Sequence, residues 1–204
     1  MTKRLIALSL AIVISLCGHL SASSHAQTLS EAAEASQDAG PYKKELEADF
    51  SKVVKYGEAK IENIEMETFK RDMARLHQDS DRLTLINYWA SWCAFCYMEF
   101  QPLRKLADDH PEMVKIIYVG DTKNGYKEFT RISDKANLPQ DDNFYDSRNF
   151  VRNWINVRTY PTTLLVSPDG KILYRFEGNG EWNSEYMRNF LKSIYDTTKK
   201  PSGS

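Results

Sequence analysis

The chain has 204 residues, three of them cysteines, and its 27 Lys and Arg against 28 Asp and Glu give a formal net charge of −1. This length is enough for one domain with a sizeable core and an extension. The balanced charge gives no reason to expect a nucleic acid or an anionic membrane as partner. Three cysteines are also too few for a small disulfide-stapled scaffold.

Residues 1–26 have the pattern of a cleaved secretory signal peptide. A basic start precedes an apolar run over residues 5–16, and small and polar residues lead to Ala26. The run is too short to span a bilayer comfortably, so we expect a periplasmic or cell-envelope protein that is not transmembrane once processed. Cys17 leaves lipoprotein anchoring open as the less favoured alternative, because a leucine rather than a small residue precedes it. Cleavage after Ala26 would discard this cysteine and leave two.

The segment after the leader predicts a flexible lead-in and a helical extension over residues 27–57. Small and polar residues come first, and Pro41 then opens a helical pattern that Gly57 ends. Residues 58–197 are expected to form the folded domain, and residues 198–204 a disordered tail.

Periodicity and turn residues predict the elements of the folded domain. In chain order we expect a strand at 60–64, a helix at 66–77, a buried strand at 83–89, a helix after Cys93, a strand at 114–119, helices through 126–132 and 150–154, a hairpin of 163–166 with 172–176, and a helix through 187–194. A Ser167-Pro168-Asp169-Gly170 turn supports the hairpin. Helices and strands alternate in the first part of this domain, and a hairpin comes near its end. This order predicts an α/β fold with a mixed sheet covered on both faces.

The sequence Trp92-Cys93-Ala94-Phe95-Cys96 follows the buried strand directly and opens a helix. A helix N-terminus carries partial positive charge and unpaired N–H groups, and both favour a thiolate. Cys93 is therefore the candidate nucleophile of dithiol–disulfide exchange, and Cys96 is the candidate resolving cysteine. A structural disulfide or half of a metal site is the alternative. A closed zinc site needs four ligands, however, and the two histidines beyond the leader lack motif spacing.

The run Asn87-Tyr88-Trp89-Ala90-Ser91-Trp92-Cys93-x-x-Cys96-x-x-Glu99 resembles the active-site run of TlpA/ResA-type thiol–disulfide oxidoreductases in the thioredoxin superfamily. Downstream, Tyr160-Pro161-Thr162-Thr163 resembles the cis-proline loop of that family, and the hairpin after it also matches. The resemblance covers about residues 83–194. It implies a thioredoxin fold, α/β with a mixed central β-sheet flanked by helices, together with an N-terminal helical extension in this chain.

The resemblance also assigns roles to particular residues. Pro161 would lie across from the cysteines and keep backbone groups free to pair with a substrate. Glu99, three residues after Cys96, falls on the same side of the helix. A buried carboxylate there would raise the thiol pKa values by like-charge repulsion and could carry a proton, whereas the alternative is an exposed glutamate on the helix face. Asn87 stands where cytosolic thioredoxins carry a buried Asp, so the proton role of that Asp has no assignment in this chain.

The side chains that flank the cysteines and the proline loop are candidates for contact with a substrate protein. Trp92 and Phe95 would form part of an apolar rim around Cys93. The full set of expected substrate contacts is Trp92, Ala94, Phe95, Tyr160 and Thr162.

The favoured function is reduction of protein disulfides by a Cys93–Cys96 dithiol, with no cofactor besides that redox-active disulfide and no metal. The resemblance implies exported thiol or disulfide proteins as substrates, apocytochrome c in cytochrome c maturation among them, and a membrane thiol reductase as electron donor. The direction of electron flow stays open, so a disulfide oxidase or isomerase of the same fold is an alternative. A copper(I) carrier is the alternative of another class, because two soft thiolates suit that ion.

Overall fold

An eight-stranded mixed sheet forms the centre of the protein, with strand order β1-β8-β7-β4-β5-β6-β2-β3. The structure, a computed structural model, describes residues 40–57, 59–61, 64–78 and 80–199. β4, β5 and β6 run parallel, and the other neighbours pair antiparallel. The strands are β1 (Lys52–Lys55), β2 (Glu65–Thr68), β3 (Met73–Arg75), β4 (Leu83–Ala90), β5 (Val114–Asp121), β6 (Asn143–Tyr145), β7 (Thr162–Val166) and β8 (Ile172–Glu177).

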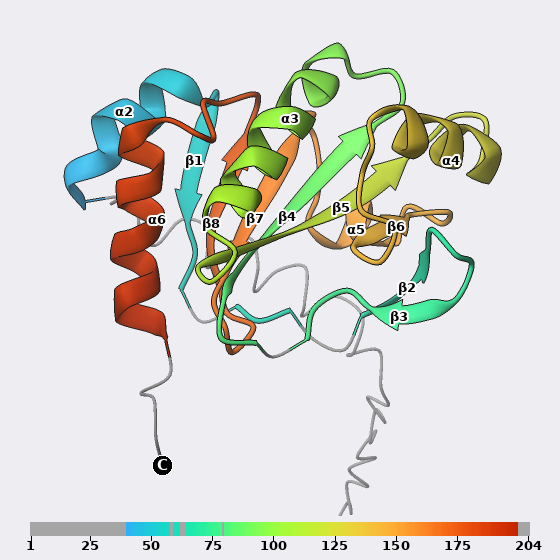
Figure 1. Cartoon of the computed structure of the whole chain (residues 1–204). Helices are drawn as coiled ribbons and strands as arrows, with labels where there is room; N and C mark the ends of the chain where they lie inside the picture. The colour runs from blue at the N-terminus through green and yellow to red at the C-terminus, as the bar shows by residue number, and fades with distance from the viewer. Residues whose placement is uncertain (1–39, 58, 62–63, 79, 200–204) are drawn as a thin grey trace, which may run out of the picture.

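Helices cover both faces of this sheet, which confirms the expected thioredoxin-type α/β architecture. The apolar sides of α2, α3, α4 and α6 pack on one face, and α5 packs on the other together with Ile61, Ile64, Met66 and Leu76. In Figure 1, α3 lies in front of β7 and β8, whereas α6 stands to the left of β1, with α2 beside it. The helical elements are η1 (Gly40–Tyr42), α2 (Lys43–Asp49), α3 (Ala94–Asp109), α4 (Tyr126–Lys135), α5 (Phe150–Trp154) and α6 (Glu185–Thr198).

Strand β4 decides which side chains reach the helix that carries the cysteines. All eight of its residues are buried, as the continuous apolar run predicts for a central strand. Because side chains alternate across a strand, Leu85 and Trp89 belong to the core under α3, whereas Ile86 and Tyr88 belong to the core of the opposite face. Asn87 lies on the same side of β4 as Leu85 and Trp89, so a polar side chain enters the core beneath α3.

The helix expected over residues 66–77 is wrong, because the chain forms the β2–β3 hairpin there. Met66 pairs with Ala74, and Arg71 occupies the left-handed region at a φ of 67° in the turn. The apolar residues that suggested a helix do not share a face: Phe69 packs against the core under α3, and Leu76 lies in the opposite core. Pairing of β2 with β6 and β3 overrides the local helical spacing.

The helix expected to end at Gly57 is also too long. Helix α2 ends at Asp49, and the β-branched pair Val53 and Val54 lies in β1, which pairs with β8 at the edge of the sheet. The strand expected over residues 60–64 is reduced, among its described residues, to an isolated bridge between Lys60 and Lys171.

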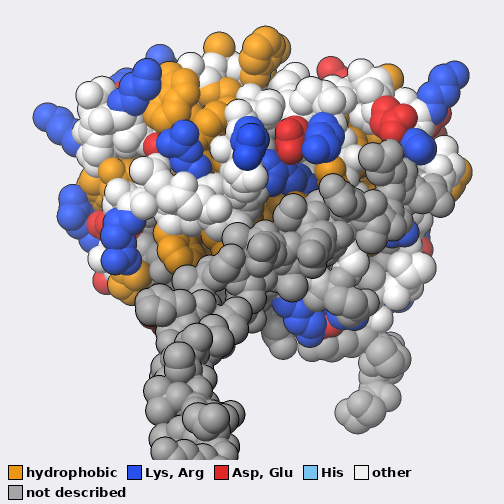
Figure 2. Space-filling model, turned by 180° about the vertical axis from the view of Figure 1, so that it is seen from behind, with side chains coloured by type: hydrophobic (Ala, Val, Ile, Leu, Met, Phe, Trp, Pro, Cys, Tyr) orange, Lys and Arg blue, Asp and Glu red, His pale blue; other side chains and the backbone are white. Residues whose placement is uncertain are grey.

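The remaining expected elements are present, since β4, α3, β5, α4, α5, the β7–β8 hairpin and α6 occupy the predicted places. Helix α6 continues to Thr198, one residue into the expected tail. The leader, Cys17 and residues 200–204 lie outside the described residues. Within the described part of the chain, no helix is long and apolar enough to cross a membrane. Seen from behind, Lys and Arg side chains are scattered among hydrophobic and acidic ones, in keeping with the balanced charge (Figure 2).

Candidate active site

The two cysteines lie at the start of α3, where the chain turns back from the carboxyl end of β4. Cys93 is the N-cap residue, and the backbone N–H of Cys96 donates to its sulfur over 3.1 Å. The two residues are joined in a disulfide, with their Cα atoms 5.3 Å apart. Cys93 keeps 8% of its surface exposed and Cys96 none. Of the pair, only Cys93 can be reached by a partner protein.

Glu99 lies one turn after Cys96 and is fully buried in the core beneath α3. Its carboxylate accepts three hydrogen bonds, each from a residue remote in the sequence. The Asn87 side-chain amide donates to Oε2 over 3.0 Å. The Trp182 indole N–H and the Gly180 backbone N–H both donate to Oε1, over 2.7 and 3.1 Å. The expectation of a buried rather than exposed carboxylate at this position therefore agrees with the geometry.

The electrostatics of this carboxylate are set by burial. Removal from water raises the pKa of Glu99 from its ordinary value of 4.5 to about 7, against three hydrogen bonds that favour the ionised form. Each donor is neutral, so no positive charge compensates the carboxylate. A group with this pKa exchanges its proton near neutral pH, which is the range that a general acid–base residue needs.

A second buried carboxylate, Asp121, lies behind the proline loop. It ends β5, and its side chain accepts a hydrogen bond from the Tyr160 hydroxyl over 2.8 Å. Burial raises the pKa of Asp121. The Tyr160 ring in turn meets the Trp92 ring edge-on, with centroids 5.7 Å apart. This contact brings the proline loop to the cysteine turn, and the peptide bond between Tyr160 and Pro161 is cis, as the resemblance implies.

The expected rim residues divide into exposed and buried ones. Phe95 is 60% exposed and Trp92 42%, and Ala94 is also exposed. Thr162 is fully buried, and its hydroxyl donates to the carbonyl of Thr159, so its side chain cannot reach a partner protein.

Pro161 also differs in part from its expected role. It is buried, and its own carbonyl accepts from the Gly178 N–H over 2.9 Å, so that acceptor is not available to a substrate. Tyr97 and Met98, 40% and 60% exposed, extend the apolar rim beyond the residues that the sequence indicated.

Sequence reasoning missed three residues of the site: Gly180, Trp182 and Asp121. Asp121 had a signal, since it ends a strand parallel to β4, and the carboxyl ends of neighbouring parallel strands meet at one edge. Gly180 and Trp182 lie in the connection between β8 and α6, more than 80 residues from Glu99 along the chain. No spacing rule links them to the cysteines.

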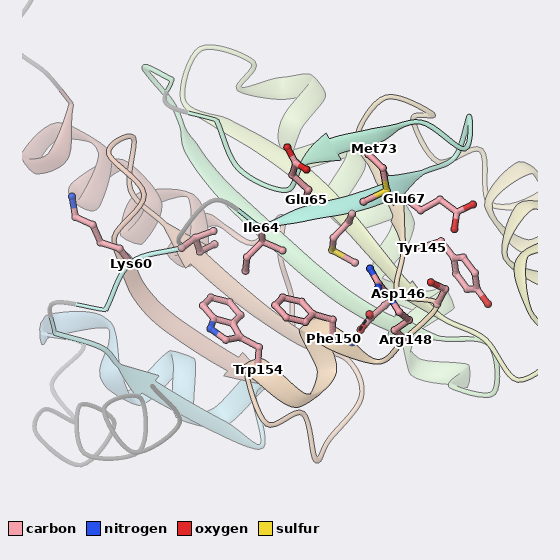
Figure 3. A pocket seen from close by; sticks show the side chains of 13 residues that line it. Lys60, Ile64, Glu65, Glu67, Met73, Tyr145, Asp146, Arg148, Phe150 and Trp154 are labelled. Atoms are coloured by element: carbon pink, nitrogen blue, oxygen red, sulfur yellow. Dashed lines mark hydrogen bonds between the residues drawn. The ribbon is translucent and has the colours of Figure 1, made fainter. Parts of the chain in front are cut away.

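A pocket of about 930 Å³ lies apart from this site, between the β2–β3 hairpin and α5. In Figure 3, Phe150 and Trp154 from α5 lie beside Ile64, with Glu65 and Met73 on the hairpin above them. None of the residues that line it belongs to α3, so we do not include it in the site. Among the residues that the structure describes, no group of three or more His, Cys, Asp or Glu side chains is arranged to hold a metal ion.

Several known proteins with similar sequences are named thiol:disulfide interchange proteins. The chain is 31% identical over 112 residues to the thiol:disulfide interchange protein DsbE of Haemophilus influenzae, a match that covers 55% of this chain and 59% of that protein. No family model matches the chain.

Solved structures agree on the fold. A thiol–disulfide oxidoreductase from Bacteroides fragilis has a TM-score of 0.53 at 20% identity, covering 67% of this chain and 99% of that one. A DsbF homologue from Corynebacterium diphtheriae has a TM-score of 0.58 at 15% identity, covering 69% and 92%. The chain therefore has the thioredoxin fold, and its sequence is similar to that of DsbE-type thiol:disulfide interchange proteins.

Proposed function

We propose that this chain is an exported thiol–disulfide oxidoreductase that reduces disulfides in other proteins through Cys93 and Cys96. The observation that carries the proposal is a cysteine pair at a helix N-terminus, one turn before the buried Glu99. The similarity to DsbE-type interchange proteins supports the same reaction class.

The reaction begins with the reduced pair. The Cys93 thiolate attacks one sulfur of a partner disulfide, that S–S bond breaks, and the other partner sulfur leaves as a thiolate. The Cys96 thiol then loses its proton and attacks the Cys93 sulfur of the mixed disulfide. This second exchange releases the remaining partner sulfur as a thiolate and leaves the Cys93–Cys96 disulfide, so two electrons have passed to the partner. We assign to the Glu99 carboxylate the acceptance of the Cys96 proton.

We infer the direction of electron flow from the charge of Glu99. A nearby carboxylate opposes thiolate formation and so raises the thiol pKa values. Strongly oxidising pairs depend on a stabilised thiolate in their reduced form, and Glu99 removes that stabilisation. We therefore expect a potential nearer the thioredoxin value of about −270 mV than the strongly oxidising value of about −120 mV. A glutathione equilibrium titration that gives a value at the oxidising end would favour the oxidase alternative.

The proposed compartment and partners rest on the leader and on the resemblance. Residues 1–26 would be removed on export, residues 27–57 would form the lead-in and extension, and residues 58–197 the thioredoxin-like unit, with β1 of the extension joined to its sheet. Exported proteins with disulfides, apocytochrome c among them, are the proposed substrates. An oxidising compartment requires a membrane thiol reductase as electron donor. A copper(I) carrier is less well supported, because no Met-rich or His-rich tract accompanies the two cysteines in the sequence.

Trapping tests the assignment of the two cysteines. Cys96→Ser should still attack partner disulfides through Cys93 and stall as a stable mixed disulfide, whereas Cys93→Ser should trap nothing, because Cys96 is buried. The adducts are counted on non-reducing gels after acid quenching, with the double Ser variant as control. Equal trapping by the two single variants would contradict the assignment of Cys93 as nucleophile and Cys96 as resolving cysteine.

A further inference from the structure

Two of the hydrogen-bond donors to Glu99 pack against the end of the extension that precedes the thioredoxin-like unit. Gly180 and Trp182 lie in the connection between β8 and α6, and this connection packs against the end of α2. The Phe50 ring meets the Trp182 ring edge-on, with centroids 5.0 Å apart. A Cβ on Gly180 would lie 2.1 Å from the Phe50 ring, so the ring rests directly on the Gly180 backbone.

Asp49 fixes the residue between the two donors. Its carboxylate accepts from the Glu181 backbone N–H over 3.2 Å and also from the Tyr186 hydroxyl at the start of α6. Phe50 and Trp182 are buried, with 3% and 0% of their surfaces exposed. The contacts therefore form one continuous chain from α2 through the connection to the Glu99 carboxylate.

We propose that Asp49 and Phe50 are positioning residues for Glu99, acting through Gly180 and Trp182. We call these two residues the α2 clamp. They touch neither cysteine and act by keeping two N–H groups within hydrogen-bond distance of Oε1. One consequence of this arrangement, that a displaced Glu99 alters the chemistry of Cys96, deepens the proposed function and rests on it. The positioning itself does not depend on that function.

The surroundings of Glu99 contain few other groups that titrate. The cysteine pair lies on α3 itself, and the Tyr118 phenol on β5 is a buried neighbour whose pKa is raised by burial and, to a lesser extent, by the Glu99 charge. Asn87 on β4 is neutral. In the oxidised protein the cysteines do not titrate, so Glu99 is the group expected to change charge near neutral pH in this core.

The Trp182 indole N–H gives a direct spectroscopic reading of Glu99. In the oxidised protein, its ¹H–¹⁵N resonance, assigned by its loss in Trp182→Phe, should titrate with an inflection near pH 7. Loosening the clamp weakens donors that favour the ionised carboxylate. Phe50→Leu and Asp49→Ala should therefore move the inflection to higher pH by about one pH unit.

Two matched controls separate positioning from a general loss of packing. Phe190→Leu removes a buried ring that packs on Phe176 but makes no ring contact with Trp182, so it should lower the melting temperature and leave the inflection in place. Asp49→Asn removes the same charge as Asp49→Ala but keeps an acceptor oxygen, so it should restore the wild-type inflection.

Each outcome decides the proposal. A wild-type Trp182 resonance that does not titrate between pH 5 and 9 would overturn it, as would an inflection that is unmoved in both clamp variants. The trapping experiment reports the proposed function separately. A protein that exchanges no disulfides but shows the expected titrations contradicts the proposed function and supports the α2 clamp. Clamp variants that exchange disulfides but show an unmoved inflection support the function and contradict the clamp.

Discussion

Burial of the Glu99 carboxyl should make the stability of the protein fall as the pH rises from about 4.5 to 7. The folded protein binds a proton at Glu99 up to a pKa of about 7, whereas the unfolded chain loses it near the ordinary value of 4.5. Between these values the unfolded state binds fewer protons at this site, so the free energy of unfolding decreases with pH. A difference of about 2.5 pKa units corresponds to roughly 3 kcal/mol, fully lost above pH 7.

Glu99→Gln removes this dependence while keeping the shape of the side chain. Its amide oxygen can still accept from Trp182 and Gly180. Its NH₂ group would face the Asn87 amide, whose Oδ1 has no hydrogen-bond partner among the described residues and can turn to accept from it. We therefore expect the variant to fold and to be more stable than the wild type at pH 8.

The assay is urea unfolding of oxidised wild type and variant at several pH values from 4.5 to 8. The stability of Glu99→Gln relative to wild type should increase by about 3 kcal/mol across this range, because all other groups titrate equally in both proteins. Glu112→Gln, a change at an exposed glutamate, is the control and should leave the profile unchanged. A difference between Glu99→Gln and wild type that does not vary with pH would refute the reasoning.

Three further changes follow from the site. Gly180→Ala places a methyl group against the Phe50 ring, so thermal melts should show a loss of about 1–3 kcal/mol, and a melting temperature equal to that of wild type would contradict this close approach. Tyr160→Phe leaves Asp121 without its hydroxyl donor, so it should destabilise the protein by about 1–3 kcal/mol at pH 8 and by less at a pH below the raised pKa of Asp121, where the carboxyl is protonated. Trp92→Ala should slow exchange with a protein disulfide and leave exchange with oxidised glutathione nearly unchanged, because the exposed ring offers contact area only to a large partner.

The parts of the site that the sequence predicts are those encoded by neighbouring residues. The apolar run of β4, the cysteine pair and the helix after it are contiguous, and strand and helix periodicity identify them directly. The β7–β8 hairpin is predictable for the same reason, because the Pro168-Asp169-Gly170 turn lies between its strands.

The parts that the sequence does not predict depend on contacts between remote segments. Glu99 can be placed on the inner side of α3 by its spacing from Cys96, but its three donors come from two other segments, β4 and the β8–α6 connection. The β2–β3 hairpin resembles a helix in sequence because its apolar residues happen to recur at helical spacing, and the pairing of β2 with β3 and β6 determines the outcome. Periodicity alone cannot distinguish apolar residues that pack into two opposite cores from apolar residues that form one face of an amphipathic helix.

Asn87 explains why the chemistry beneath α3 should depend on a single ionisable carboxyl. Its amide donates to Glu99 and, over 2.9 Å, to the Thr163 hydroxyl on β7, so it joins the carboxylate to the central strands. An amide neither gains nor loses a proton at these pH values, whereas an Asp at this position would titrate together with Glu99 and share one proton with it. With Asn in place, the change of charge next to Cys96 is confined to Glu99, and its pKa responds to donors on β4 and on the β8–α6 connection. The oxidised protein should therefore show one inflection near pH 7 in this core rather than two coupled ones.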